Sequence, residues 1–286
     1  MNTSDCFTPD PDITGLGVRI NLYASSLIIA VLPENPLTLP LIDVCRANAS
    51  MGGFALLVTA IIRTAQGKLT LYHAIFILHM LFFLGIGLFP VGRYKPTSMR
   101  KLWTLLVTIC VTLMFQSWAL YIWAKAPVFG AHALGGEDVT TCNREIKYIF
   151  VFVSVSATVL WLRALWMAVL GLEALGIMLY LLSIGSMFVA RGKGEMDTPQ
   201  QVSSHLRPSQ LLLILSCVYA IVMLELYVKR NRRIQGLSNN EAWTFGQIIS
   251  LVMIANSFNE VVHFLLVCVP SVVPRSRGNE EQNGDN

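Results

Sequence analysis

The chain has 286 residues, of which 54% are hydrophobic and only 13% charged, and its formal net charge is +4. A soluble domain usually carries about 25% charged residues, so this composition excludes a soluble globular protein. The Lys and Arg residues lie between apolar runs and form no patch of the nucleic-acid-binding type, so we expect no nucleic-acid partner.

Residues 1–12 form a polar, acidic N-terminal segment. Apolar runs follow one after another, and a bilayer core is crossed by roughly 20 apolar residues in a helix. We place the runs at residues 13–32, 47–66, 69–89, 102–123, 146–162, 164–190, 210–228 and 243–269. The sequence therefore predicts an all-α fold, a polytopic transmembrane helical bundle over residues 13–269, followed by a disordered polar tail at 270–286.

The number of spans is seven or eight, because residues 146–190 are too long for one crossing and only the stretch 161–166 could turn the chain. Basic residues in short loops favour the cytoplasmic side. The clusters at 93–101 and 229–233 share a side only if four spans separate them, which favours eight. A seven-span bundle with one long broken helix stays open. The first helix would act as its own insertion signal, so in a eukaryotic cell we expect the endoplasmic reticulum membrane.

The N-terminal segment and the loop at 125–144 lie on the same side with either count, because four spans separate them. Cys6 and Cys142 are the only cysteines in these two segments. A disulfide between them is chemically permitted if that side is an oxidising lumen. Chance placement is the alternative.

Charged side chains inside a span cost about 2.5 to 3.5 kcal/mol at the bilayer centre on insertion scales, so each is a candidate functional residue. Arg19, Glu173 and Glu260 lie well inside apolar runs. Arg63, Arg163 and Glu225 lie near the ends of runs, where snorkelling to the interface is the simpler explanation.

The last run carries the sharpest polar pattern. Asn256, Asn259, Glu260 and His263 are spaced i, i+3, i+4 and i+7, which places them on one stripe of a helix. Such a stripe must face the bundle interior, either as polar contacts between helices or as the lining of a cavity. Gln116 and His79 are further single polar residues within runs.

The sequence lacks the residues that several classes of chemistry require. The last two runs have no interior Lys for a retinal Schiff base, no Asp lies deep in any run to hold Mg²⁺, and no His/Cys set has zinc spacing. We expect neither a metal site nor a cofactor. A buried carboxylic acid can instead stay protonated and start a carbocation, which aromatic faces stabilise. Candidate faces are Trp118, Tyr121, Trp161, Trp166, Tyr180 and Phe258.

The opening Asp10-Pro11-Asp12-Ile13-Thr14-Gly15-Leu16-Gly17-Val18-Arg19, with Tyr23 after it, resembles a fungal family of multi-span membrane proteins, as does Trp243-Thr244-Phe245-Gly246-Gln247. Some members resemble the membrane-bound terpene cyclases of meroterpenoid biosynthesis, of the ascofuranone and macrophorin type. The resemblance implies a cyclase that acts on the prenyl tail of a prenylated aromatic or epoxycyclohexenone substrate.

The first hypothesis is therefore a metal-independent terpene cyclase of the isomerase type, with Glu260 or Glu173 as the general acid. The residues expected to bind or orient the substrate are Arg19, Asp12, Asn256, Asn259, His263 and Gln116. The alternatives are a small-molecule transporter, an orphan receptor-like protein, or a bundle with a purely structural role.

Overall fold

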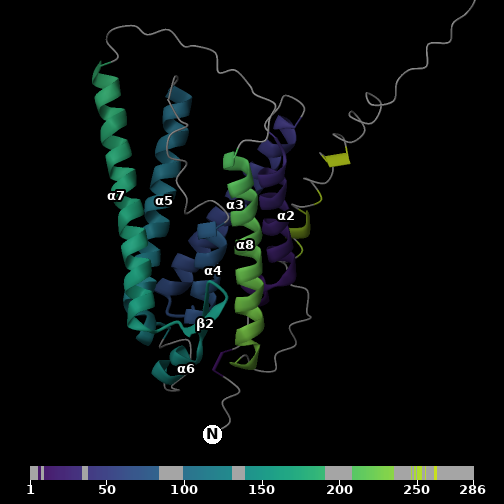
Figure 1. Cartoon of the computed structure of the whole chain (residues 1–286), viewed down its shortest axis with the longest axis vertical. Coiled ribbons are helices and arrows are strands. Elements are labelled where there is room, and N and C mark those ends of the chain that lie inside the picture. Colours follow the sequence, from purple (N-terminus) through teal and green to yellow (C-terminus); the bar gives the residue numbers. More distant parts are fainter. Residues whose placement is uncertain are drawn as a thin grey trace, which may run out of the picture.

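The computed structural model of the chain describes residues 6–7, 10–33, 38–83, 99–130, 139–190 and 208–234, with isolated positions 246, 248, 250–252, 255 and 261–262. These residues form mainly long helices that run side by side (Figure 1). The predicted tail at 270–286 and most of the last predicted span lie outside this part of the chain.

Five helical segments are long and apolar enough to cross a membrane: Pro11–Val31, Leu39–Ala65, Leu105–Val128, Leu160–Leu182 and Gln210–Asn231. They belong in turn to α1 and α2 (Pro11–Thr14, Leu16–Val31), α3 (Leu39–Ala65), α5 with η1 (Met99–Lys125, Ala126–Val128), α7 (Leu160–Ala190) and α8 (Pro208–Asn231). A shorter apolar helix, α4 (Leu71–Phe83), lies among them. These helices identify an integral membrane protein.

The first helix begins at Pro11, two residues before the start of the predicted run. The Asp10 carboxylate accepts a hydrogen bond from the Asp12 backbone N–H at 3.0 Å, and Pro11 occupies the first helical position, where its missing N–H costs nothing. Gly15 is extended, at φ −63° and ψ 155°, and separates α1 from α2.

The predicted span at 146–162 is wrong. Residues Lys147–Phe150 (β1) and Val153–Ser156 (β2) form an antiparallel hairpin, with Tyr148 opposite Val155. The run is rich in β-branched and aromatic residues and its described strands are only four residues each, so it suits a pleated surface better than a helix. The argument for eight spans from the two basic clusters therefore fails.

The predicted turn at 161–166 is also absent, because α7 is continuous from Leu160 to Ala190. This stretch contains no Pro or Gly that would break a helix, and Arg163 finds partners at the end of α5 (below).

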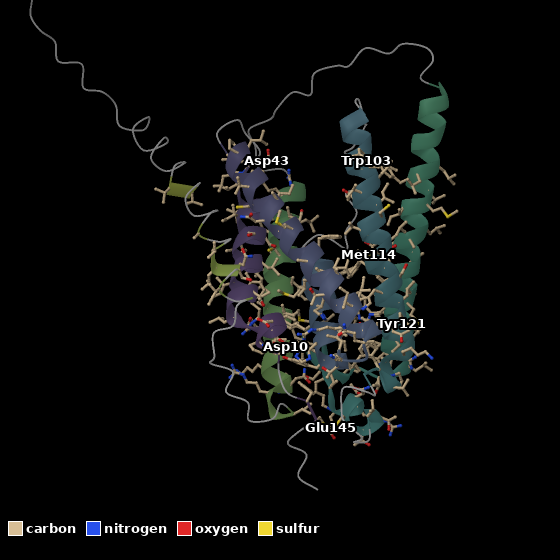
Figure 2. The ribbon with its side chains drawn as sticks, turned by 180° about the vertical axis from the view of Figure 1, so that it is seen from behind. Asp10, Asp43, Trp103, Met114, Tyr121 and Glu145 are labelled. Carbon is tan, nitrogen blue, oxygen red and sulfur yellow. A yellow bond between two sulfur atoms is a disulfide. The ribbon has the colours of Figure 1, made fainter. Side chains whose placement is uncertain are left out.

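The helices form two groups joined by α4. α2 packs against α3 and α8, whereas α7 packs mainly against α5, and α4 contacts α3, α5 and α8 (Figure 1). Figure 2 shows Asp43 and Trp103 toward one end of the bundle and Glu145 at the other. The hairpin and α6 (Val139–Glu145) lie at the Glu145 end, which we call the hairpin end; η2 (Arg232–Ile234) follows α8 there.

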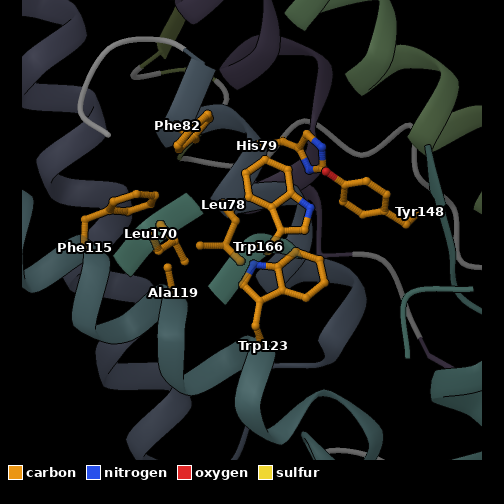
Figure 3. A pocket seen from close by; sticks show the side chains of 9 residues that line it. All are labelled: Leu78, His79, Phe82, Phe115, Ala119, Trp123, Tyr148, Trp166 and Leu170. Carbon is orange, nitrogen blue, oxygen red and sulfur yellow. The ribbon is translucent and has the colours of Figure 1, made fainter. Parts of the chain in front are cut away.

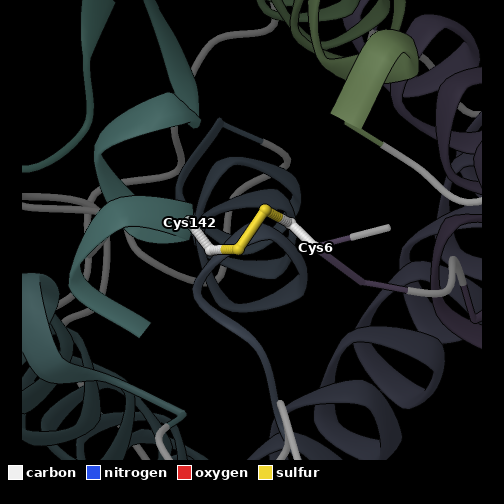
Figure 4. The surroundings of a disulfide bond; sticks show 2 residues. All are labelled: Cys6 and Cys142. Carbon is white, nitrogen blue, oxygen red and sulfur yellow. A yellow bond between two sulfur atoms is a disulfide. The ribbon is translucent and has the colours of Figure 1, made fainter. Parts of the chain in front are cut away.

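The N-terminal segment is fastened to the hairpin end by a disulfide between Cys6 and Cys142, with an S–S distance of 2.06 Å (Figure 4). Phe7 is buried and stacks on Tyr72 of α4, with ring centroids 4.6 Å apart. Asp10 adds an ion pair with Arg63 of α3, and its backbone N–H donates to His73. Residues 6, 7 and 10, the described residues before α1, are thus part of the packed fold.

Candidate functional site

A small pocket with a cavity volume of about 20 Å³ lies between α4, α5, α7 and the first hairpin strand (Figure 3). Ligand pockets commonly measure about 300 to 1,000 Å³, so this cavity has room for about one water molecule and would have to open to admit a larger ligand. Its lining is almost wholly apolar and aromatic: Leu78, His79, Phe82, Phe115, Ala119, Trp123, Tyr148, Trp166 and Leu170.

Helical spacing explains how the lining residues meet. Phe115, Ala119 and Trp123 recur at intervals of four on α5, and Trp166 and Leu170 do the same on α7. Since α5 runs toward the hairpin end and α7 runs away from it, Trp123 lies beside Trp166. The pocket therefore has its indole rings at the hairpin end and reaches deeper into the bundle along both helices.

The rings make close mutual contacts. Trp123 and Trp166 stack with centroids 5.9 Å apart and an interplanar angle of 6°. Tyr148 meets both of them edge-on, at 5.7 Å and 6.1 Å, and Phe82 meets Trp166 edge-on at 5.3 Å. Aromatic faces carry partial negative charge, so this lining favours a cationic or electron-poor group.

Gln116 directly follows the lining residue Phe115 on α5, and Glu173 lies one turn beyond the lining residue Leu170 on α7. Gln116 is 2% exposed, and neither its amide nitrogen nor its amide oxygen has a hydrogen-bond partner in the described part of the chain. Both Glu173 carboxyl oxygens are likewise buried and unbonded there. The two side chains are neighbours, although no hydrogen bond of normal geometry joins them. A buried polar group without a partner costs about 1–3 kcal/mol, so this neighbouring amide and carboxyl are the polar groups beside the pocket best placed to bind a ligand.

The hairpin strand that supplies Tyr148 is anchored by a buried amide. Asn231, at the end of α8, accepts from the Lys147 N–H at 2.8 Å and donates to the Lys147 carbonyl at 2.8 Å. It also donates to the Tyr227 carbonyl at 2.9 Å. Burial raises the pKa of the Tyr148 hydroxyl well above its usual range, so this group stays protonated.

Arg163 holds together α5 and α7, the two helices that form the other wall of the pocket. Its guanidinium donates to the backbone carbonyls of Trp123 at 2.8 Å and Ala124 at 2.6 Å. Both carbonyls are in the last turn of α5, where backbone carbonyls have no hydrogen-bond partners within the helix. Arg163 therefore acts as a C-terminal cap of α5. Its position near a helix end thus reflects packing between α7 and α5.

Arg19 and Asp12 do not line the pocket. Arg19 donates to Glu225 of α8 at 2.5 Å, and the Tyr23 hydroxyl donates to the same carboxylate oxygen at 3.0 Å. The Asp12 carboxylate accepts from the Gly246 N–H at 3.2 Å. A Cβ at position 246 would come within 2.8 Å of the Asp12 oxygen, so glycine permits this approach. Two elements of the opening motif therefore tether other segments of the chain.

The polar stripe of Asn256, Asn259, Glu260 and His263 lies outside the described residues. The guanidinium of Arg19, another charged group inside a predicted span, pairs with Glu225 of α8.

The pocket aromatics were only partly anticipated from sequence. Trp166 was among the candidate faces, but Trp118 donates to Thr64 at 3.0 Å, and Tyr121 and Trp161 are about half exposed, at 51% and 47%. Trp123 and Tyr148 were missed. The i+7 spacing from Gln116 to Trp123 was a usable signal; nothing local indicated that Tyr148 would turn inward on a strand.

The described residues contain no group of three or more His, Cys, Asp or Glu side chains placed to hold a metal ion. The chain matches no protein-family model, no curated protein and no solved structure.

Proposed function

We propose that this protein is an integral membrane terpene cyclase of the isomerase type, in which a carboxylic acid starts the carbocation. The observation that carries the proposal is that the buried Gln116 amide and the carboxyl group of the half-buried Glu173 are neighbours beside an aromatic pocket, and that neither group has a hydrogen bond of normal geometry in the described part of the chain. The substrate class is a meroterpenoid with a prenyl or epoxyprenyl chain, attached to an aromatic or epoxycyclohexenone head.

Glu173 is the general acid of this proposal. Its protonated carboxyl donates to an epoxide oxygen, the C–O bond breaks with its electron pair moving to oxygen, and a tertiary carbocation forms. The alkene π electrons then attack this cation to close a ring. Gln116 is suited to hold the epoxide or the acid in position, because its amide offers both a donor and an acceptor. General acid catalysis of this kind contributes about 10²–10⁴-fold to a rate.

The aromatic lining supports the cationic steps. Indole is the best cation–π partner among side chains, and a desolvated cation gains about 2 kcal/mol or more from such a face. The stacked pair of Trp123 and Trp166 therefore provides a surface along which a cation is stabilised while water is kept out.

We further propose seven crossings in the endoplasmic reticulum membrane. The five long apolar helices are counted together with α4, whose apolar sequence continues to residue 89, and with the apolar run at 243–269. This arrangement puts Cys6 and Cys142 on one side, and their disulfide supports assigning the hairpin end to an oxidising lumen. A lipid-dissolved prenyl chain would reach the pocket from within the bilayer.

The test is to supply microsomes that contain the protein with a panel of farnesyl-arene and farnesyl-epoxycyclohexenone epoxides. A product of equal mass but different retention is expected from the wild type. If no substrate in the panel is isomerised, the enzyme proposal fails and a transporter or receptor becomes the better hypothesis.

Three variants locate the acid. Glu173→Gln should lower product formation by at least about 100-fold, in line with the loss of a general acid. Glu145→Gln, which changes an exposed carboxyl at the hairpin end, is the matched control and should retain activity. Glu260→Gln tests the second candidate from the sequence. Full activity in Glu173→Gln would remove this residue from the mechanism.

A further inference from the structure

The hairpin end of the bundle carries an excess of positive charge. Exposed basic side chains lie there in the last turns of α5, α6 and α8, on β1 and in η2, and we call them the basic surface: Lys125, Arg144, Lys147, Lys229, Arg230 and Arg232. None of them forms an ion pair with another described residue. The described exposed carboxylates near this end are Asp12, which accepts from the Gly246 N–H, and Glu145. Positive charge therefore predominates over the described part of this end.

Two buried amides bring these charges together. The side-chain amide of Asn143 donates to three backbone carbonyls in and just after η1, at 3.0, 3.1 and 3.3 Å, so Arg144 lies beside the end of α5. Asn231 binds both backbone groups of Lys147, so this lysine lies beside the last turn of α8. Like charges that the fold holds close together repel one another, and an anion between them relieves the repulsion.

Two aromatic side chains mark the level at which the basic surface lies. Tyr121 precedes Lys125 by one turn on α5, and Trp161 is in the first turn of α7, which begins at the hairpin end. Both side chains are about half exposed. Tyr and Trp are enriched at the boundary between hydrocarbon and headgroups, and Lys and Arg at helix ends extend their charged groups toward the headgroups. The basic surface is therefore at the level of the phospholipid headgroups.

We propose that the basic surface binds anionic phospholipids in the leaflet at the hairpin end. A headgroup with net negative charge supplies the counter-charge that the described surface lacks, and each Lys or Arg near an anionic leaflet strengthens the attraction about fivefold. The preference of basic residues for the cytoplasmic side does not account for these charges, because the disulfide supports a luminal hairpin end. This lipid site is independent of the cyclase function proposed above.

The experiment is native mass spectrometry of the purified full chain, released from detergent micelles that contain equal amounts of dioleoyl-phosphatidylserine and dioleoyl-phosphatidylcholine. The two lipids have the same acyl chains, so the ratio in which they are bound reports the headgroup alone. The wild type should retain phosphatidylserine in at least about fivefold excess. Combining Lys147→Gln, Lys229→Gln and Arg230→Gln should lower this ratio at least about fivefold. Lys125→Gln with Arg144→Gln tests the other half of the basic surface and should lower the ratio as well.

Two controls separate charge from structure. Lys147→Arg with Lys229→Arg keeps both charges and should retain the wild-type ratio. Arg46→Gln removes a base at the opposite end of the bundle, where Arg46 pairs with Asp43 at 3.4 Å, and should leave the ratio unchanged. Thermal unfolding in phosphatidylcholine micelles shows that the variants fold, since substitutions of exposed side chains change stability little.

Two results would overturn the inference. One is equal retention of the two lipids by the wild type, which would make an acidic protein segment the better partner for the basic surface. The other is an unchanged ratio in both folded Gln variants. Neither result bears on the cyclase proposal, which is tested by product formation.

Discussion

Gln116 allows a test in which stability and activity are expected to change in opposite directions. Its side chain is 2% exposed, and neither polar atom is bonded in the described part of the chain. A buried amide without hydrogen bonds costs about 1–3 kcal/mol, whereas an apolar side chain of similar length does not pay this penalty. Gln116→Met should therefore raise the free energy of unfolding by about 1–3 kcal/mol while lowering product formation at least tenfold.

The measurement is reversible unfolding of the purified protein in mixed detergent micelles, followed by tryptophan fluorescence. Thr112→Val, one turn away on α5, is the matched control, because the Thr112 hydroxyl is already satisfied by the Thr108 carbonyl at 2.9 Å. Its substitution should change stability by less than about 1 kcal/mol. If Gln116→Met instead destabilises the protein by 1 kcal/mol or more, the amide is bonded in the unliganded protein and the argument for a ligand-binding amide is refuted.

Three further outcomes follow from the contacts that hold the pocket. Loss of the disulfide in Cys6→Ala should destabilise the protein by up to about 5 kcal/mol, the chain-entropy value for a sequence separation of 136 residues. This value is an upper bound, because inserted helices already restrict the reduced chain. Thermal unfolding with and without reductant measures the loss, and identical unfolding curves for the variant and the wild type would contradict it. Asn231→Leu leaves the Lys147 backbone N–H and carbonyl without partners, so it should lower the free energy of unfolding by about 3 kcal/mol and abolish most of the activity. Unfolding close to that of the wild type would show that other contacts hold the hairpin. Arg163→Ala should lower the free energy of unfolding by about 2 kcal/mol and speed amide hydrogen exchange in the last turn of α5. Arg163→Lys should restore part of both. Unchanged amide exchange in Arg163→Ala would argue against the cap.

The sequence alone determined that this is a helical membrane protein. Runs of about 20 apolar residues and a charge content of 13% are typical of membrane-spanning helices and exclude a soluble domain. Five of the described helices have the length and hydropathy that a membrane crossing requires. The sequence also determined which polar residues are costly at membrane depth, so Glu173 and Gln116 could be selected without coordinates. Cys6 and Cys142 could be matched because spans alternate sides.

Only the tertiary structure decided which of these residues meet. Gln116 and Glu173 were separate candidates, and their proximity depends on the antiparallel packing of α5 against α7. The turning of 147–156 into a hairpin, which brings Tyr148 to the pocket, depends on the Asn231 amide 84 positions away from Lys147. The physical reason is that lipid is as apolar as a helix interior, so hydrophobicity marks a span but does not mark the face that a span turns toward its neighbours.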